Sequence, residues 1–75
     1  MLTEDQYNRL KSHEGAINMW HDMGIEIASN DQFREMFAIH NQITGLNEVI
    51  SCGGCRASVT NRLYDFMREY EKENK

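Results

Sequence analysis

Residues 51–62 read SCGGCRASVTNR, and the interpretation of the whole chain starts from them. Gly53 and Gly54 can adopt backbone angles that are closed to other residues, so we expect a glycine hinge there. After the hinge, apolar residues recur at steps of four, three and four, as they do on one face of a helix: Val59, Leu63, Phe66 and Tyr70. This pattern predicts a helix over residues 55–73, with two cysteines, Cys52 and Cys55, at its N-terminus.

The cysteine pair Cys52 and Cys55 has three interpretations. A helix start favours thiolates, so the pair suits a redox centre, although the βαβ pattern of a thioredoxin-like fold is missing. Two thiolates also supply half of a zinc site, which His40, His21 or a second chain would complete. The third interpretation is purely structural, because two small residues fit a tight helix entrance.

The same helix start could bind an anion through its backbone. Free amides after Gly53 and Gly54, with Arg56 and Ser58 nearby, could cradle a phosphate or carboxylate, such as that of a nucleotide. The phosphate-loop signature Gly-x-x-x-x-Gly-Lys is absent. No cofactor other than zinc is suggested by the sequence.

Length and composition indicate a single small helical domain. A chain of 75 residues buries only about 60% of its unfolded surface, so its core is marginal unless a metal, a disulfide or a partner adds to it. Hydrophobic residues make up 40% and charged residues 27%, as in ordinary folded domains. Proline is absent, which favours an all-helical chain over residues 1–75.

The formal charge of −4 is unevenly distributed along the chain. Residues 1–51 contain eight acids against three Lys and Arg, a net of −5, and residues 52–75 contain four acids against five Lys and Arg, a net of +1. This balance argues against duplex nucleic acid as a ligand and favours a basic protein partner. No apolar run reaches the roughly 20 residues needed to cross a bilayer, so we expect a cytoplasmic protein that does not bind membranes.

In the first third of the chain, Thr3 and Gln6 have the spacing of a capping box, so a helix is expected to begin near Glu4. Gly15 predicts a kink or break, and Met23-Gly24 predicts the end of this first helix. Ile25 and Ile27 are expected to tuck beneath the helices in a connector. Ser29 or Asn30 is expected to cap the next helix.

The second predicted helix runs from Asp31 to about Thr44. Its apolar stripe is Phe33, Met36, Phe37, His40 and Ile43, and a histidine on such a stripe is more often a satisfied core residue than a ligand. A turn at Gly45 and a short helical piece up to Ile50 should follow. The sequence therefore predicts a small three-helix domain, arranged up-down-up, with a glycine hinge before its last helix.

Several large side chains lie beside the main stripes and are candidate partner-binding residues: Met19, Trp20, Met23, Tyr64 and Met67. Flexible methionines suit either an irregular core or an adaptable contact surface. On a chain this short, the surplus predicts a homo-oligomer or a docked protein partner. No arrangement of catalytic residues can be recognised, so we do not expect an enzyme.

Residues 50–55, ISCGGC, lead into Val59, Arg62-Leu63 and Tyr70-Glu71. In these positions the last third of the chain resembles small proteins of tailed bacteriophages in which a Cys-x-x-Cys pair opens the last helix. The resemblance implies a setting, namely the host cytoplasm, and a role as inhibitor or adaptor. Phage accessory proteins of this size tend to bind and redirect a host protein or to blunt a host defence.

Overall fold

The computed structural model describes residues 2–74, and within that range the chain is all-α and compact. The helices are α1 (Glu4–Lys11), α2 (Glu14–Met23), α3 (Asn30–Thr44) and α4 (Gly53–Glu73). The all-α prediction is confirmed. The expected count of three helices was wrong, because the first predicted helix is two separate helices.

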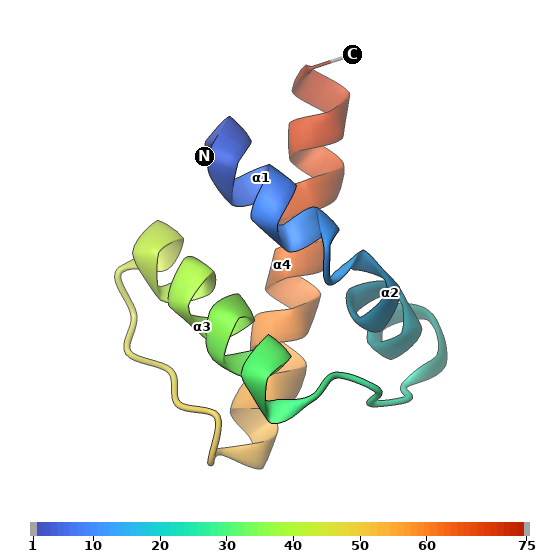
Figure 1. The fold of residues 1–75 in the computed structure, drawn as a ribbon, viewed down its shortest axis with the longest axis vertical. Helices are drawn as coiled ribbons and strands as arrows, with labels where there is room; N and C mark the ends of the chain where they lie inside the picture. The colour runs from blue at the N-terminus through green and yellow to red at the C-terminus, as the bar shows by residue number, and fades with distance from the viewer. Residues whose placement is uncertain (1, 75) are drawn as a thin grey trace.

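The long helix α4 is the element on which the other three pack (Figure 1). α1 crosses its C-terminal half, and α2 and α3 contact it nearer its start. Fully buried side chains from all four helices meet in the core: Leu10, Ile17, Met36, Ile39, Val59, Leu63 and Met67. Of the apolar face predicted for the last helix, Val59 and Leu63 are fully buried, whereas Phe66 and Tyr70 are half-buried and pack against the core.

The up-down-up arrangement was also wrong. In Figure 1, α3 and α4 both rise from the lower part of the molecule, and the connector of residues 45–52 descends at the left from the end of α3 to the start of α4. The connector can return over this distance because residues 45–49 are not helical, and a non-helical chain covers more distance per residue than a helix does. The expected helical piece up to Ile50 is absent: residues 45–49 contain no helix, and a turn follows at residues 50 and 51.

Two capping boxes fix the starts of α1 and α3. The Thr3 hydroxyl accepts from the Gln6 amide at 3.1 Å, and the Gln6 side chain accepts from the Thr3 amide at 3.0 Å. Ser29 and Gln32 repeat the arrangement at 3.2 and 2.9 Å. Each box satisfies amides that a helix start leaves unpaired, and a cap of this kind contributes about 1 kcal/mol. Both predicted helix starts are confirmed.

The break between α1 and α2 lies at Ser12 and His13, not at Gly15, which lies in the first turn of α2. The half-buried His13 side chain contacts α3 instead of continuing the helix surface. Its Nδ1 accepts from the Gln32 side-chain amide at 3.3 Å, which leaves Nε2–H to donate to Glu35 at 2.7 Å. The chain therefore turns where a side chain can reach α3, and a glycine is not required.

α2 and α3 both end at a glycine in the left-handed conformation, Gly24 with φ of 69° and Gly45 with φ of 75°. Residues with a Cβ rarely adopt this conformation, so glycine is the usual residue one position past a helix end. The predicted ends at Met23 and Thr44 are confirmed.

A polar cluster joins α1 and α2 to the C-terminal half of α4. The Tyr7 hydroxyl donates to Glu71 at 2.5 Å, and Arg68 donates to Glu14 at 2.9 Å, while Lys11 contacts Glu14 at 3.1 Å. The hydrogen bond to Glu71 raises the pKa of Tyr7. Hydrogen bonds from Lys11 and then Arg68 lower the pKa of Glu14, although its partial burial opposes them. The cluster thus favours a charged Glu14.

Candidate functional site

The two cysteines lie at the start of α4, as predicted, and they are at disulfide distance. Their Cα atoms are 5.2 Å apart. Cys52 is the exposed N-cap residue, and its Sγ accepts from the Cys55 amide at 3.3 Å, while Cys55 is half-buried. The cross-link therefore encloses the first turn of the helix and leaves one sulfur accessible to solvent.

The expected glycine hinge is not present. Neither Gly53 nor Gly54 has a positive φ, and both lie within the first turn of α4. A Cβ built on either would meet no other atom within 4 Å. The direction change is made by Cys52, whose backbone is extended at φ −87° and ψ 111°. Two glycines in a helical turn cost about 1 kcal/mol each relative to alanine, so this turn is intrinsically weak.

Arg56, directly after the cross-link, is tied into the fold. Its Nε donates to the Ile50 carbonyl at 2.8 Å, and a terminal nitrogen donates to Glu26 at 3.3 Å. Its guanidinium also lies over the Phe33 ring, 5.2 Å from the centroid. Of the residues predicted to bind an anion, Arg56 is thus already paired with a carboxylate, while Gly53, Gly54 and Ser58 are exposed.

His40 is fully buried on α3, and both ring nitrogens have partners. Arg62 donates to its Nε2 at 3.2 Å, and its Nδ1–H donates to the Asn41 side chain at 3.0 Å. Within residues 2–74, no three His, Cys, Asp or Glu side chains are grouped so that they could hold a metal ion. Sulfurs in a disulfide are not zinc ligands, so the zinc prediction applies to the reduced chain and stays a prediction.

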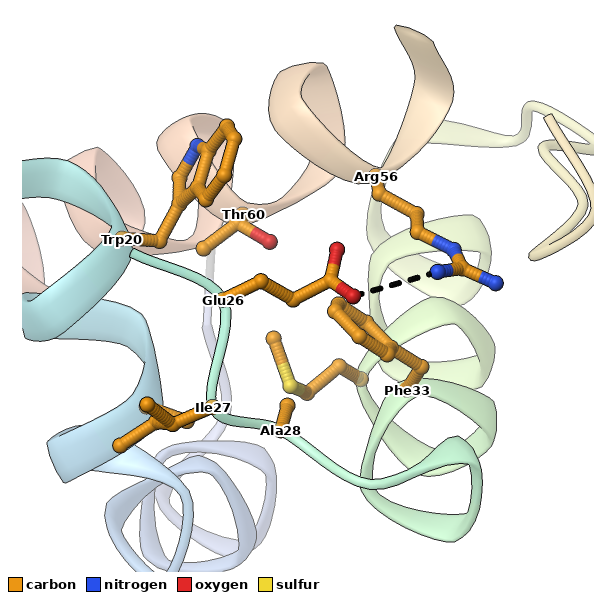
Figure 2. A pocket seen from close by; sticks show the side chains of 9 residues that line it. Trp20, Glu26, Ile27, Ala28, Phe33, Arg56 and Thr60 are labelled. Atoms are coloured by element: carbon orange, nitrogen blue, oxygen red, sulfur yellow. Dashed lines mark hydrogen bonds and ion pairs between the residues drawn. The ribbon is translucent and has the colours of Figure 1, made fainter. Parts of the chain in front are cut away.

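A small pocket lies where α2, α3, α4 and the connector of residues 24–29 meet (Figure 2). Its empty volume is about 240 Å³ with open solvent included, and its interior has room for about one water molecule. Figure 2 shows the Glu26 side chain reaching from the connector to Arg56 beside the Phe33 ring. The lining residues are Ala16, Trp20, Glu26, Ile27, Ala28, Phe33, Met36, Arg56 and Thr60. A nucleotide would not fit unless the connector moved.

Large apolar side chains of the connector and of the last turn of α2 lie beside this pocket. Met23 is 67% exposed, Ile25 47% and Ile27 54%, and Trp20 is half-buried next to them. The expectation that the two isoleucines tuck beneath the helices was therefore wrong: both side chains are about half exposed, although Ile27 also lines the pocket. We call Trp20, Met23, Ile25 and Ile27 together the connector surface.

Of the five residues predicted to bind a partner, only Trp20 and Met23 lie on the connector surface. Met67 is fully buried in the core, so its expected place on a contact surface was wrong. Tyr64 is half-buried, with its ring stacked on that of His21 at 3.6 Å between centroids, and Met19 is half-buried on α2. Ile25 and Ile27 were expected to be buried, so they were missed as contact residues, and no signal in the sequence pointed to their exposure.

Comparison of the chain with protein-family models, with curated proteins and with solved structures found no match. Of the four helices in residues 2–74, none is both long and apolar enough to cross a bilayer. The function is therefore inferred from the connector surface and its surroundings.

Proposed function

We propose that this chain is a small, acidic, non-enzymatic protein that binds a protein partner through the connector surface. The observation that carries the proposal is the exposure of three large apolar side chains within five residues: Met23 at the end of α2, and Ile25 and Ile27 on the connector that follows it. A contiguous apolar group of this kind is expensive to leave in water and is typical of interaction sites. Trp20 at its edge is the residue type that most often anchors such contacts.

The charges around the connector surface define the chemistry of the partner. Residues 20–31 contain Asp22, Glu26 and Asp31 and no Lys or Arg. The exposed fractions of the Asp22 and Asp31 side chains are 58% and 91%, and each has a neighbouring partner, His21 at 2.9 Å and Arg34 at 2.7 Å. An apolar centre with an acidic rim fits a segment that carries apolar side chains flanked by Lys or Arg.

A second copy of this chain is the competing occupant, since a homo-oligomer was predicted from the sequence. Two connector surfaces facing each other would bring two copies of Asp22 close together, and this repulsion opposes association at low salt, whereas Glu26 and Asp31 are paired with Arg56 and Arg34. A basic segment of another protein is therefore the occupant that we propose. The resemblance to phage accessory proteins supports a host protein as its source, with this chain as inhibitor or adaptor.

Binding can be measured with two synthetic amphipathic peptides of equal length, one of Leu and Lys and one of Leu and Glu. Trp20, the single tryptophan, reports binding by its fluorescence. We expect the Lys peptide to bind, with an affinity that falls as salt is added, and the Glu peptide to bind far more weakly.

A pair of matched double variants separates the connector surface from general acidity. Ile25→Ser with Ile27→Ser should weaken binding of the Lys peptide about tenfold or more, because it removes the apolar centre. Leu46→Ser with Val49→Ser changes two similarly exposed aliphatic residues, at 43% and 56%, on the other long connector. This control should change the affinity by less than about twofold. Equal losses in both variants would contradict the proposal.

A further inference from the structure

We infer that the Cys52–Cys55 disulfide is a redox switch that controls access to the connector surface, an inference that rests on the proposed function. Three observations carry it: a cross-link with one accessible sulfur, a glycine-rich turn inside that cross-link, and an arginine that joins this turn to the connector. The reduced chain is the form that binds the partner.

The first step is the dependence of the turn on the cross-link. Gly53 and Gly54 are exposed, have ordinary φ values, and have open space where a Cβ would lie. Neither a strained backbone nor a close contact therefore calls for glycine at these positions. Their effect is to make the first turn of α4 a poor helix former on its own. The disulfide holds the ends of this turn together, and without it the turn frays.

The second step is the link from the turn to the connector. The Cys55 and Arg56 amides both donate to the Cys52 carbonyl, at 3.1 and 3.3 Å, so fraying releases the backbone that carries Arg56. The Arg56 side chain holds Glu26 of the connector at 3.3 Å over the Phe33 ring. Loss of this anchor lets the connector move away from the pocket, which in the oxidised chain has room for about one water molecule. A partner side chain could then enter beside Trp20.

The chemistry is ordinary thiol–disulfide exchange with a thiol reductant. A thiolate attacks the exposed Sγ of Cys52, forms a mixed disulfide with it and releases the Cys55 thiolate, which takes up a proton. A second thiolate attacks the reductant's sulfur in the mixed disulfide and releases the Cys52 thiolate, which is protonated in turn. The protein gains two electrons and two protons, and two thiols become one disulfide. An oxidant of the disulfide class reverses the process.

The test uses amide hydrogen exchange and Trp20 fluorescence on the intact chain, oxidised and then reduced with dithiothreitol. Reduction should speed exchange at residues 54–57 by about tenfold or more and change the Trp20 emission, because the surroundings of Trp20 open. A variant with Gly53→Ala and Gly54→Ala makes the turn a better helix former. Its exchange and emission should change much less on reduction.

Binding of the Lys peptide completes the test. The reduced parent should bind the peptide more tightly than the oxidised parent, and Cys52→Ser with Cys55→Ser should resemble the reduced parent under both conditions. Equal exchange rates and equal emission in the two redox states would overturn the switch. The proposed function would survive that result, since it fails only if the two matched connector variants lose peptide affinity equally.

Discussion

The two long connectors of this protein are built alike at their ends and differently in between. Both begin after a left-handed glycine, Gly24 or Gly45, and both end at a side chain that caps the next helix, Ser29 or Cys52. Both expose aliphatic side chains to a similar extent. They differ in how the backbone between these ends is held.

The connector of residues 45–52 is tied down by hydrogen bonds. Asn41 donates to the Glu48 carbonyl at 3.1 Å and accepts from the Glu48 amide at 3.3 Å, and the Thr44 hydroxyl accepts from the Leu46 amide at 3.2 Å. In the connector of residues 24–29, Ala28 packs against the core, and the polar side-chain contact with another helix is the exposed ion pair of Glu26 with Arg56 at 3.3 Å. Exposed apolar residues on a firmly held loop stay in place, whereas those on a loosely held loop can adapt to a partner.

The largest expected loss of stability comes from truncating Phe33, a buried side chain that lines the pocket beside the connector of residues 24–29. Phe33 is 4% exposed and meets Phe37 edge-on, with ring centroids 6.3 Å apart. Phe33→Ala should lower the free energy of unfolding by about 3 to 5 kcal/mol, a large part of the stability of so small a domain. Urea unfolding followed by circular dichroism measures this. A loss under about 1 kcal/mol would mean that the pocket is not part of the core.

The next effect tests the firmly held connector. Asn41→Ala removes both hydrogen bonds to the Glu48 backbone and the side-chain oxygen that accepts from His40. It should lower the free energy of unfolding by about 1 to 3 kcal/mol. Amide exchange at residues 45–50 should speed up while exchange at residues 25–28 stays unchanged. If both connectors loosened equally, the contrast between them would not hold.

A smaller, pH-dependent effect on the free energy of unfolding is expected from Glu14, which lies in α2 and outside both connectors. Because hydrogen bonds from Lys11 and Arg68 lower the pKa of Glu14 below its ordinary value of 4.5, folding is stabilised when pH exceeds that value. This stabilisation is lost as pH falls through the lowered pKa. Glu14→Gln should cost about 0.5 to 1 kcal/mol at neutral pH, and the parent and variant should converge in acid. A constant difference down to the acid limit would contradict this assignment.

The smallest effect on stability should come from the ion pair that holds the connector of residues 24–29. The side chains of Glu26 and Arg56 are 43% and 31% exposed, so Glu26→Gln should cost less than about 1 kcal/mol. It should nevertheless speed exchange at residues 25–28 in the oxidised chain. An unchanged exchange rate would show that other contacts hold this connector.

Local signals in the sequence predicted the parts of the fold that depend on nearby residues. Thr3 with Gln6, Ser29 and the glycines that end α2 and α3 act within a few positions of themselves, so their roles could be inferred from spacing. The break at His13 could not, because it depends on Gln32 and Glu35 of another helix. The return of residues 45–52 depends in the same way on Asn41 reaching Glu48.

The candidate site was predicted only in part, because it too depends on contacts between residues that are far apart in the sequence. Spacing placed the cysteine pair at a helix start and drew attention to Arg56. It could not show that Arg56 is joined to Glu26, which is 30 positions away. Periodicity marked Met67 as surplus, but the packing of four helices rather than three buries it. The exposure of Ile25 and Ile27 depends in the same way on how the connector lies against α2, α3 and α4, which spacing in the sequence does not show.

The most direct test of docking on the connector surface is an amide exchange footprint of the bound Lys peptide on the reduced chain. The peptide should slow exchange within residues 20–31 and leave residues 45–50 unchanged, although the two connectors expose similar aliphatic side chains. Protection that covered both connectors equally, or that lay on residues 45–50 alone, would contradict the assignment of the binding site.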